Sequence, residues 1–447
     1  MSALADIFKA YDVRGRVGAE LTADVANRIG QAFAAWLPEH SNKTIAVGRD
    51  MRPDSAELAH ALIEGIRAQG YDVIDIGEVT SDMSYFAVGK FDLAGAAMVT
   101  ASHNPGEYNG IKLYRSDVIP VGLDSGLDKV RDAVLANQFT PAEKGSVSQK
   151  NITEDWLQHC LAIVSEDFKP FRIAVDAGNG MAGPIFAELE PYVPFDVTEM
   201  YFDLDGTFPN HEANPQKPEN LKDLIKEVAD EKLDFGIAFD GDGDRAGFVD
   251  DKGRPVSGSD LISIIAKSYL VGYPGAEIVH EVRTSRATQE LIREWGGTPF
   301  RTKAGRVSIG KVMRERSAPF GGETTGHLFF KENFYADSGL LGALMAIKGL
   351  QESGKKLSEL VDEYHRYATI PETNFEVSDK EAAIKRVADA FKDDEQNWLD
   401  GLTVNFDSGW FNLRMSNTEP VMRLNAEAKT DTELQELVQK VTKLIER

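Results

Sequence analysis

Short apolar segments alternate with segments of helical spacing along most of this chain, and this alternation constrains the fold most strongly. Residues 44–48 and 72–76 are β-branched segments typical of strands, and segments of helical spacing follow them at 55–69 and about 83–90. Residues 94–99 are small and apolar, as expected of a buried parallel strand. Strand–helix alternation of this kind predicts a parallel sheet with helices on both faces.

The alternation restarts along the chain, which indicates several domains. At 447 residues the chain is long for a single hydrophobic core. A polar stretch at 138–150 interrupts the pattern, new strand–helix units begin near residues 153 and 256, and from about residue 370 the pattern is α+β. We therefore expect an α/β protein with three α/β domains of mixed or parallel sheets and a smaller α+β domain. The expected boundaries are 1–150, 151–254, 255–368 and 369–447.

Composition and charge narrow the functional class. No apolar run is long enough to cross a bilayer and the first residues lack a signal-peptide pattern, so we expect a cytoplasmic protein with no membrane partner. The single cysteine, Cys160, excludes an intramolecular disulfide, and its amphipathic surroundings predict a packing role. The net charge of −23 argues against a nucleic-acid partner. An anionic substrate would need positive charge concentrated in a site. The sequence does not distinguish a monomer from a dimer.

A serine is displayed directly after the strand predicted at 94–99. The stretch Thr100-Ala-Ser-His-Asn-Pro105 is followed by Gly106 and by Asn-Gly, all of which favour turns. Ser102 should therefore lie at the mouth of a loop at a strand end, where open α/β sheets bind ligands. Lys112 follows in the same stretch. The alternative is a polar loop whose serine caps the next helix.

Three carboxylates follow the strand predicted at 234–239. Asp240, Asp242 and Asp244 alternate with glycines and precede Arg245, which forms a set of hard oxygen ligands suited to Mg²⁺ or Ca²⁺. An EF-hand is excluded, because its sixth position would be Arg245, its twelfth would be Asp251, and a strand precedes the loop. The alternative is an exposed Asp-Gly hairpin turn.

Two further loops carry groups suited to a phosphorylated sugar. The stretch Gly321–His327 displays a carboxylate, two hydroxyls and an imidazole between turn glycines. The stretch 414–423 combines two arginines, two hydroxyls and an asparagine, and arginine suits phosphate geometry. An ordinary β-turn with surface arginines is the alternative for the second stretch.

Taken together, these loops favour phosphoryl transfer, because its catalysis consists mostly of positioning and charge neutralisation. A serine hydrolase is excluded, since Ser102 has no G-x-S-x-G elbow and a hydrolase triad does not use an acidic metal loop.

The motifs resemble those of the α-D-phosphohexomutase family, in particular its bacterial phosphomannomutase/phosphoglucomutase branch, over essentially the whole chain. The matching stretches are Tyr11-Asp-Val-Arg-Gly15, Thr100-Ala-Ser-His-Asn-Pro105, Asp240-Gly-Asp-Gly-Asp-Arg245, Gly322-Glu-Thr-Thr-Gly-His327 and Arg414-Met-Ser-Asn-Thr-Glu-Pro420. The resemblance implies four domains around a central cleft. It also implies an isomerase that interconverts hexose 6-phosphate and hexose 1-phosphate, of mannose, glucose or both. The reaction would use Mg²⁺, a phosphoserine enzyme and a hexose 1,6-bisphosphate intermediate.

The resemblance also assigns a role to each matching residue. Ser102 would carry the phosphoryl group, Lys112 would be the candidate general acid/base, and Arg14 and His103 would support the phosphoserine. The metal ligands would be Ser102, Asp240, Asp242 and Asp244. The substrate would contact Arg245, Arg283, Arg306, Glu323, Thr325, His327, Arg414, Ser416, Asn417, Thr418 and Arg423.

Three departures from the branch leave the preferred sugar open. Arg283 stands where the branch usually has lysine, Arg306 where it usually has histidine, and Thr324-Thr325 where it usually has Met-Ser. Because arginine stays charged at neutral pH, Arg306 cannot serve as a base and should contact a phosphate or a hydroxyl. A phosphoglucosamine mutase and a non-catalytic sugar-phosphate-binding homologue remain alternatives. The second would have to retain Ser102, Lys112 and the three aspartates for no catalytic purpose.

Overall fold

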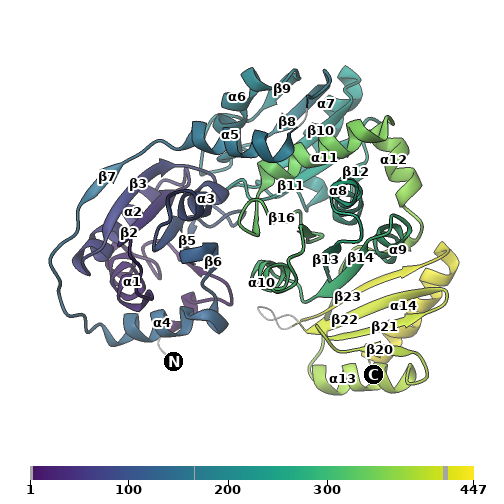
Figure 1. The fold of residues 1–447 in the computed structure, drawn as a ribbon. Coiled ribbons are helices and arrows are strands. Elements are labelled where there is room, and N and C mark those ends of the chain that lie inside the picture. Colours follow the sequence, from purple (N-terminus) through teal and green to yellow (C-terminus); the bar gives the residue numbers. More distant parts are fainter. Residues whose placement is uncertain (1–3, 166, 416–420, 447) are drawn as a thin grey trace. The chain divides into compact units, whose positions relative to one another are not determined.

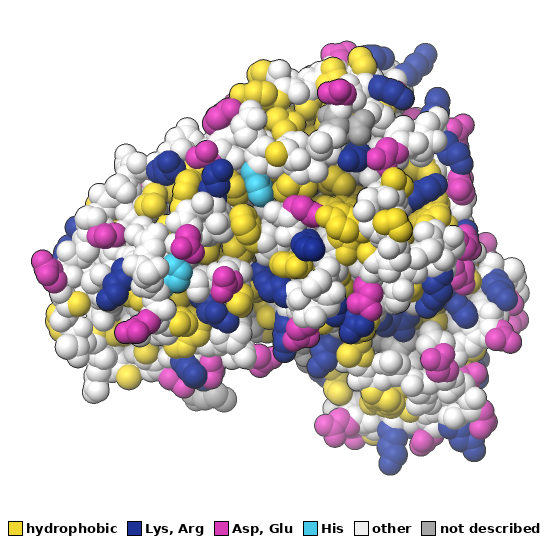
Figure 2. All heavy atoms as spheres, in the orientation of Figure 1, with side chains coloured by type: hydrophobic (Ala, Val, Ile, Leu, Met, Phe, Trp, Pro, Cys, Tyr) yellow, Lys and Arg dark blue, Asp and Glu magenta, His cyan; other side chains and the backbone are white. Residues whose placement is uncertain are grey.

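The computed structural model describes residues 4–165, 167–415 and 421–446 (Figure 1). The chain divides into two compact units. Unit 1 comprises Met1–Val256 and Thr325–Ser358, and unit 2 comprises Ser257–Thr324 and Glu359–Arg447. No helix within these described ranges is long and apolar enough to cross a membrane. Acidic and basic side chains are interspersed over the face of the molecule drawn in Figure 2.

The first sheet of unit 1 is mixed rather than purely parallel. Strands β4, β2, β3 and β7 run parallel, whereas β5 pairs with both β4 and β1 in antiparallel fashion. The short strand β6 pairs with β5. In sheet order the strands are β1 (Val13–Arg16), β5 (Tyr108–Arg115), β4 (Gly95–Val99), β2 (Thr44–Arg49), β3 (Asp72–Glu78) and β7 (Val147–Gln149), with β6 at Ile119–Pro120.

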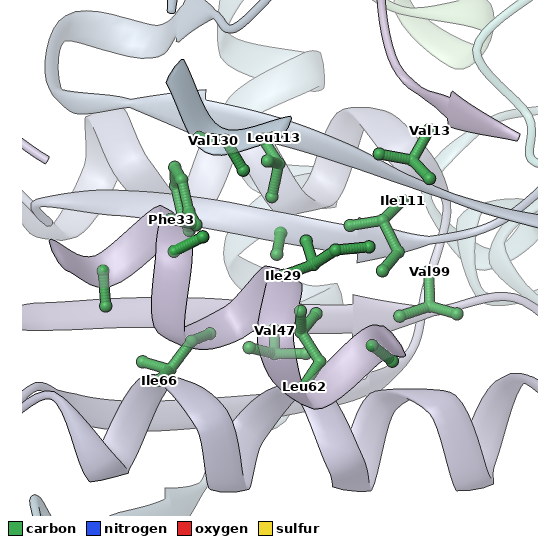
Figure 3. Packing of buried hydrophobic residues seen from close by; sticks show 14 of the residues in the cluster. Val13, Ile29, Phe33, Val47, Leu62, Ile66, Val99, Ile111, Leu113 and Val130 are labelled. Atoms are coloured by element: carbon green, nitrogen blue, oxygen red, sulfur yellow. The ribbon is translucent and has the colours of Figure 1, made fainter. Parts of the chain in front are cut away.

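A hydrophobic core joins this sheet to its helices. Figure 3 shows Ile29 and Phe33 of one helix and Leu62 of the next beside Ile111 and other apolar strand side chains. Since strand side chains alternate between the two faces, Lys112 lies on the face opposite to Ile111. The helices around this sheet are α1 (Ala23–Trp36), α2 (Ser55–Ala68), α3 (Ser81–Phe91) and α4 (Leu127–Ala136).

The second sheet of unit 1 has three parallel strands, β10, β8 and β9, extended by the antiparallel β11 and β12. Helix α5 carries Cys160, which is buried as expected, and burial raises the pKa of its thiol. The strands are β12 (Pro255–Val256), β11 (Ala246–Asp250), β10 (Phe235–Phe239), β8 (Arg172–Asp176) and β9 (Asp196–Met200). The helices are α5 (Thr153–Val164), α6 (Ala182–Leu189) and α7 (Lys222–Glu231). An antiparallel pair, β16 (Leu328–Phe330) and β17 (Ala336–Asp337), precedes α11 (Gly339–Ser353).

Unit 2 contains three parallel strands and a separate antiparallel sheet. The parallel strands are β14 (Thr298–Thr302), β13 (Glu277–Glu281) and β15 (Phe320–Gly322), with helices α8 (Gly258–Gly272), α9 (Arg286–Glu294) and α10 (Arg306–Arg316). Helix α12 (Leu357–Tyr364) leads into the antiparallel strands β18 (Ala368–Thr369), β23 (Val421–Ala428), β22 (Gly409–Met415), β21 (Leu402–Phe406) and β20 (Glu395–Asn397), with β19 (Thr373–Glu376) also paired to β23.

Helices α13 (Lys380–Ala390) and α14 (Asp431–Ile445) share a hydrophobic core with this antiparallel sheet. The predicted α/β class with an α+β C-terminal part is confirmed. The boundaries after residues 150, 254 and 368 remain predictions.

The structure corrects two of the predicted turns. Asn109-Gly110 lies inside β5, and Gly321-Gly322 lies inside β15. A Cβ on Gly110 would lie 2.4 Å from the carbonyl oxygen of Val13, so this glycine permits close strand pairing rather than a turn. A Cβ on Gly321 would lie 2.7 Å from the Met313 sulfur, so the second glycine lets α10 pack against the sheet. Helices α10 and α11 were not predicted from the sequence.

His280 on β13 makes the stability of unit 2 dependent on pH. Burial, reinforced by Arg301, lowers its pKa from 6.5 to about 3. Between these values the unfolded chain binds a proton that the folded chain excludes, so stability decreases as pH falls through this window. At pH 5 we expect a loss of about 2 kcal/mol relative to pH 8.

Denaturant unfolding of the wild type and of His280→Asn at both pH values checks this expectation. The Asn amide can replace the imidazole Nδ1, which lies 3.1 Å from the Glu281 carbonyl oxygen. The variant should lose the part of the pH dependence that His280 contributes. An equal pH dependence in the two proteins would contradict the assignment.

Candidate active site

Polar residues follow the carboxyl ends of neighbouring parallel strands in unit 1. Asp50 and Arg52 follow β2, Ser81 follows β3, and Ser102 follows β4. Open α/β sheets bind ligands at this edge. The loop after β10, which starts at Asp240, reaches the same place, because the Ser102 hydroxyl donates a hydrogen bond of 2.7 Å to Asp240 Oδ2.

Ser102 is held in an uncommon backbone conformation. Its φ is +51°, in the left-handed region, and its side chain is buried. The Thr100 hydroxyl accepts the Ser102 N–H at 2.9 Å, and Arg245 Nη2 donates to Ser102 Oγ at 3.0 Å. A Cβ on Gly241 would lie 2.5 Å from the Ser102 carbonyl oxygen, so glycine is required where the two loops meet. Ser102 thus follows the end of β4, as the sequence predicts, but its side chain is buried rather than displayed.

Arg52 fixes the backbone of the Ser102 loop, a role that the sequence analysis missed. Its buried guanidinium donates to the carbonyl oxygens of Ser102, Asn104, Pro105 and Tyr108 at 2.9, 2.6, 2.9 and 2.9 Å. Asp50 pairs with Arg52 Nε at 3.2 Å. The signal in the sequence was the position of Arg52 just beyond a strand end, but a charged turn there looks like solvent-exposed surface.

The three predicted metal-ligand carboxylates converge. Oxygens of Asp240, Asp242 and Asp244 lie within 4.8 Å of one another, and all three residues are buried. The Lys112 ammonium, 2.6 Å from Asp242 and 2.5 Å from Asp244, supplies one positive charge. Asp242 Oδ1 is buried and accepts no hydrogen bond from the described residues. A cluster of carboxylate oxygens with an orphaned acceptor fits a hard divalent cation.

The pKa values of the aspartates in this cluster shift in opposite directions. Burial raises the pKa of Asp240 to about 7, although Arg245 opposes this shift. Burial and Asp244 also raise the pKa of Asp242, but Lys112 and Ser81 outweigh them and lower it to about 2. A divalent cation would favour the ionised form of all three carboxylates.

Removing one carboxylate should weaken metal binding. We expect Asp242→Asn to reduce Mn²⁺ affinity at least about tenfold, because an amide oxygen lacks the full negative charge that a hard cation prefers. Mn²⁺ titration followed by electron paramagnetic resonance measures this change. Asp124→Asn makes the same chemical change at an exposed position in η3 (Leu123–Ser125) and should leave the affinity unchanged. Equal Mn²⁺ affinities of the wild type, Asp242→Asn and Asp124→Asn would contradict a metal site at the three aspartates.

Two residues predicted to support the phosphoserine lie beside Ser102. Arg14 Nη1 donates to Asn104 Oδ1 at 2.8 Å, so Arg14 is anchored to the Ser102 loop. His103 Nδ1 lies 3.0 Å from Ser102 Oγ. The neighbouring Arg245 guanidinium, followed by burial, lowers the pKa of His103 to about 2. His103 is therefore a neutral imidazole near the serine, and its Nδ1 accepts a hydrogen bond from Arg245.

Two of the predicted sugar contacts also lie in unit 1. His327 Nε2 lies 3.5 Å from Asp244 Oδ1 and 3.9 Å from Asp337 Oδ2. Thr325 Oγ1 lies 3.1 Å from His327 Nδ1. The hydroxyl and imidazole predicted to hold sugar oxygens thus lie near Asp244 of the aspartate cluster.

In unit 2 the predicted residue Arg283 pairs with a second buried carboxylate, that of Glu281. Glu281 at the end of β13 accepts hydrogen bonds from Arg283 Nε at 2.8 Å and from the Thr324 hydroxyl at 2.6 Å. Glu323 accepts the Gly305 N–H at 2.5 Å, directly before Arg306 at the start of α10. Burial alone would lower the pKa of Arg283, but Glu281 and Glu323 raise it above its ordinary value. Glu281, which lies at a strand end, was not predicted from the sequence.

The predicted phosphate-binding arginines lie opposite each other on the antiparallel sheet. Arg414 on β22 and Arg423 on β23 are register partners. Both donate to Glu372, at 2.9 and 3.3 Å. Glu372 was not predicted from the sequence as a site residue. Ser416, Asn417 and Thr418 lie outside the described residues.

Four successive parts of the chain match models of one protein family. The alpha/beta/alpha domains I, II and III of phosphoglucomutase/phosphomannomutase match residues 5–140, 153–253 and 257–367, and its C-terminal domain matches 372–444. The chain belongs to the phosphoglucomutase/phosphomannomutase family. The family membership expected from the motifs is confirmed.

Members of the phosphoglucomutase/phosphomannomutase family from several bacteria resemble the chain over nearly its whole length. A protein of Xanthomonas campestris pv. campestris named "Phosphohexose mutases" is 40% identical over 434 residues, which are 96% of each chain. A phosphomannomutase of Salmonella montevideo is 39% identical over 443 residues, again 96% of each chain. The solved structure of a family protein from Burkholderia thailandensis has a TM-score of 0.91 and 32% identity, and the match covers 99% of this chain and 97% of that one.

Proposed function

We propose that this chain is a phosphohexomutase that interconverts hexose 6-phosphate and hexose 1-phosphate, with mannose, glucose or both as the sugar. The main observation in support is the hydrogen bond between Ser102 Oγ and Asp240 within the cluster of three buried aspartates. A hydroxyl among metal-type ligands is placed to carry a phosphoryl group whose charge a cation neutralises. Relatives named phosphomannomutase and phosphohexose mutase support the same reaction.

In this proposal the phosphoryl group passes from phosphorylated Ser102 to the free hydroxyl of the bound sugar phosphate. The phosphorus–oxygen bond to Ser102 breaks as the bond to the sugar oxygen forms. The sugar hydroxyl loses a proton to a base, and the Ser102 oxygen regains one. Mg²⁺ bound by Asp240, Asp242, Asp244 and the phosphoserine would neutralise charge on the transferring group.

Lys112 is the proposed general acid/base. Two carboxylates within 2.6 Å favour its ammonium form, so in this arrangement it is a proton donor. His103 stays neutral because of Arg245, and its imidazole accepts hydrogen bonds without adding charge. Arg245 and Arg14 supply fixed positive charge beside Ser102.

Unit 2 would bind the phosphate that is not transferred. Arg414 and Arg423 converge on one anionic group, which supports a role in binding an anion. Glu323, Thr325 and His327 would hold the sugar hydroxyls, with Arg283 and Arg306 as further contacts. Residues that recognise only a phosphate can accept either end of a hexose 1,6-bisphosphate, which permits the intermediate to reorient.

Mutase turnover with Mg²⁺ and a trace of glucose 1,6-bisphosphate tests the proposal. The kcat/KM for mannose 1-phosphate should clearly exceed that for glucosamine 1-phosphate. A preference for glucosamine 1-phosphate would support the proposed phosphoryl transfer but show that the substrate is an amino sugar. Absence of turnover with mannose, glucose and glucosamine phosphates would overturn the function.

A further inference from the structure

Glu372 lies among the cations of the proposed phosphate-binding site. It precedes β19, and its carboxylate accepts hydrogen bonds from Arg414 at 2.9 Å, Arg423 at 3.3 Å and Asn425 at 3.1 Å. Arg283 Nη1 lies 3.8 Å away. One carboxylate thus collects donors from two neighbouring strands and from the loop after β13. This constellation of donors is the kind that binds phosphate.

The carboxylate is ionised at neutral pH. Burial would raise the pKa of Glu372, but the hydrogen bond from Asn425 and the charges of Arg414 and Arg283 together lower it. Its side chain is about a quarter exposed (26%), and those of Arg414 and Arg423 are 13% and 24% exposed. A soluble anion can therefore reach this group of cations.

We propose that Glu372 is an internal competitor for the substrate phosphate, an inference that rests on the proposed function of this site. Its carboxylate holds the arginines in convergent positions, because three guanidinium groups would otherwise repel one another. It also cancels part of the charge that attracts a phosphate dianion. Glu372 therefore lowers the affinity of unit 2 for phosphate.

Moderate affinity has a direct use in this reaction. A bisphosphate intermediate must release its distal phosphate from the arginines before its other end can bind there. Arginine–phosphate pairs are among the strong, charge-assisted hydrogen bonds, so an unopposed cluster would hold the intermediate too long. Glu372 remains beside the arginines and can form its hydrogen bonds with them again when the phosphate leaves.

The variant Glu372→Gln removes the negative charge of the side chain but keeps its size and shape. If the amide oxygen replaces Oε2, the hydrogen bonds from Arg414 and Asn425 are retained, and only the longest bond, to Arg423, is lost. Removing one negative charge within about 4 Å of a phosphate site should tighten binding of inorganic phosphate about tenfold. Isothermal titration of the full-length protein with inorganic phosphate measures this effect.

Three variants make the measurement specific. Glu381→Gln changes an exposed glutamate in the first turn of α13 and should leave phosphate affinity unchanged. Arg414→Gln should abolish binding in both the wild-type and the Glu372→Gln backgrounds, which locates the phosphate. Glu372→Asp keeps the charge and should not tighten binding. Unchanged or weaker binding in Glu372→Gln would overturn the inference and leave Glu372 as a structural residue only.

Kinetics separate this inference from the proposed function. With a mutase substrate, Glu372→Gln should lower both KM and kcat, since the intermediate is held more tightly. A loss of positioning would instead raise KM. Tighter phosphate binding in a protein without mutase activity would refute the proposed function alone. Full mutase activity with unchanged phosphate affinity would refute the competitor role alone.

Discussion

Ser102→Ala should reduce mutase turnover at least about a thousandfold, because the proposed path through a phosphoserine would lose its nucleophile. Ser102 Oγ is the group that Asp240 and Arg245 surround. The variant should fold normally, since it loses one hydroxyl at a site that remains otherwise intact. A coupled assay of glucose 1-phosphate conversion measures the loss.

A second readout tests whether Ser102 carries phosphate. Mass spectrometry of protein incubated with glucose 1,6-bisphosphate should find one phosphoryl group on the wild type and none on Ser102→Ala. Ser148→Ala on β7 makes the same change at an exposed position and should retain both activity and phosphorylation. Full turnover by Ser102→Ala would refute the catalytic assignment.

Arg52→Met should destabilise unit 1 by about 3–5 kcal/mol, because it leaves the Asp50 carboxylate buried without its counter-charge. It also removes the donors to four carbonyl oxygens of the loop that holds Ser102. We expect kcat to fall about a hundredfold even at temperatures where the variant is folded, since small displacements of a reacting group are costly. Chemical unfolding and turnover at 10 °C below the melting point measure the two effects.

The double variant Asp50→Asn/Arg52→Met distinguishes the two causes. Removing the lone charge should recover part of the unfolding free energy, because the neutral amide costs less to bury. It should not recover kcat, since the loop carbonyls still lack their donors. Recovery of both quantities would show that Arg52 acts only as a counter-charge, and a stable, fully active Arg52→Met would contradict both roles.

The strands and the main site loops could be predicted because each depends on local signals. The apolar strand before Ser102 and the alternating aspartates after residue 239 are visible in short stretches of sequence. The position of Lys112 on a strand was harder to predict. Asn109-Gly110 favours a turn locally, but strand pairing with Gly15 and Arg14 and the hydrogen bond from Asn109 to Ser55 override that preference.

The residues that position the site were not predictable because their partners are distant in sequence. Arg52 and Asn104 are 52 positions apart, and Glu372 and Arg414 are 42 apart. Taken alone, an arginine or a glutamate in a polar turn has the composition of exposed surface. Only the tertiary fold shows that Arg52 is buried and that Glu372 faces arginines from two strands.

The burial of Cys160 offers a practical way to attach probes at chosen positions of this chain. Its thiol is inaccessible and its pKa is raised, so thiol reagents should leave the native protein unmodified. Cysteines introduced at the exposed positions Val147 and Trp398, one in each unit, would then be the reactive pair. A donor and an acceptor dye attached there would report the separation of the units by single-molecule energy transfer while the enzyme turns over.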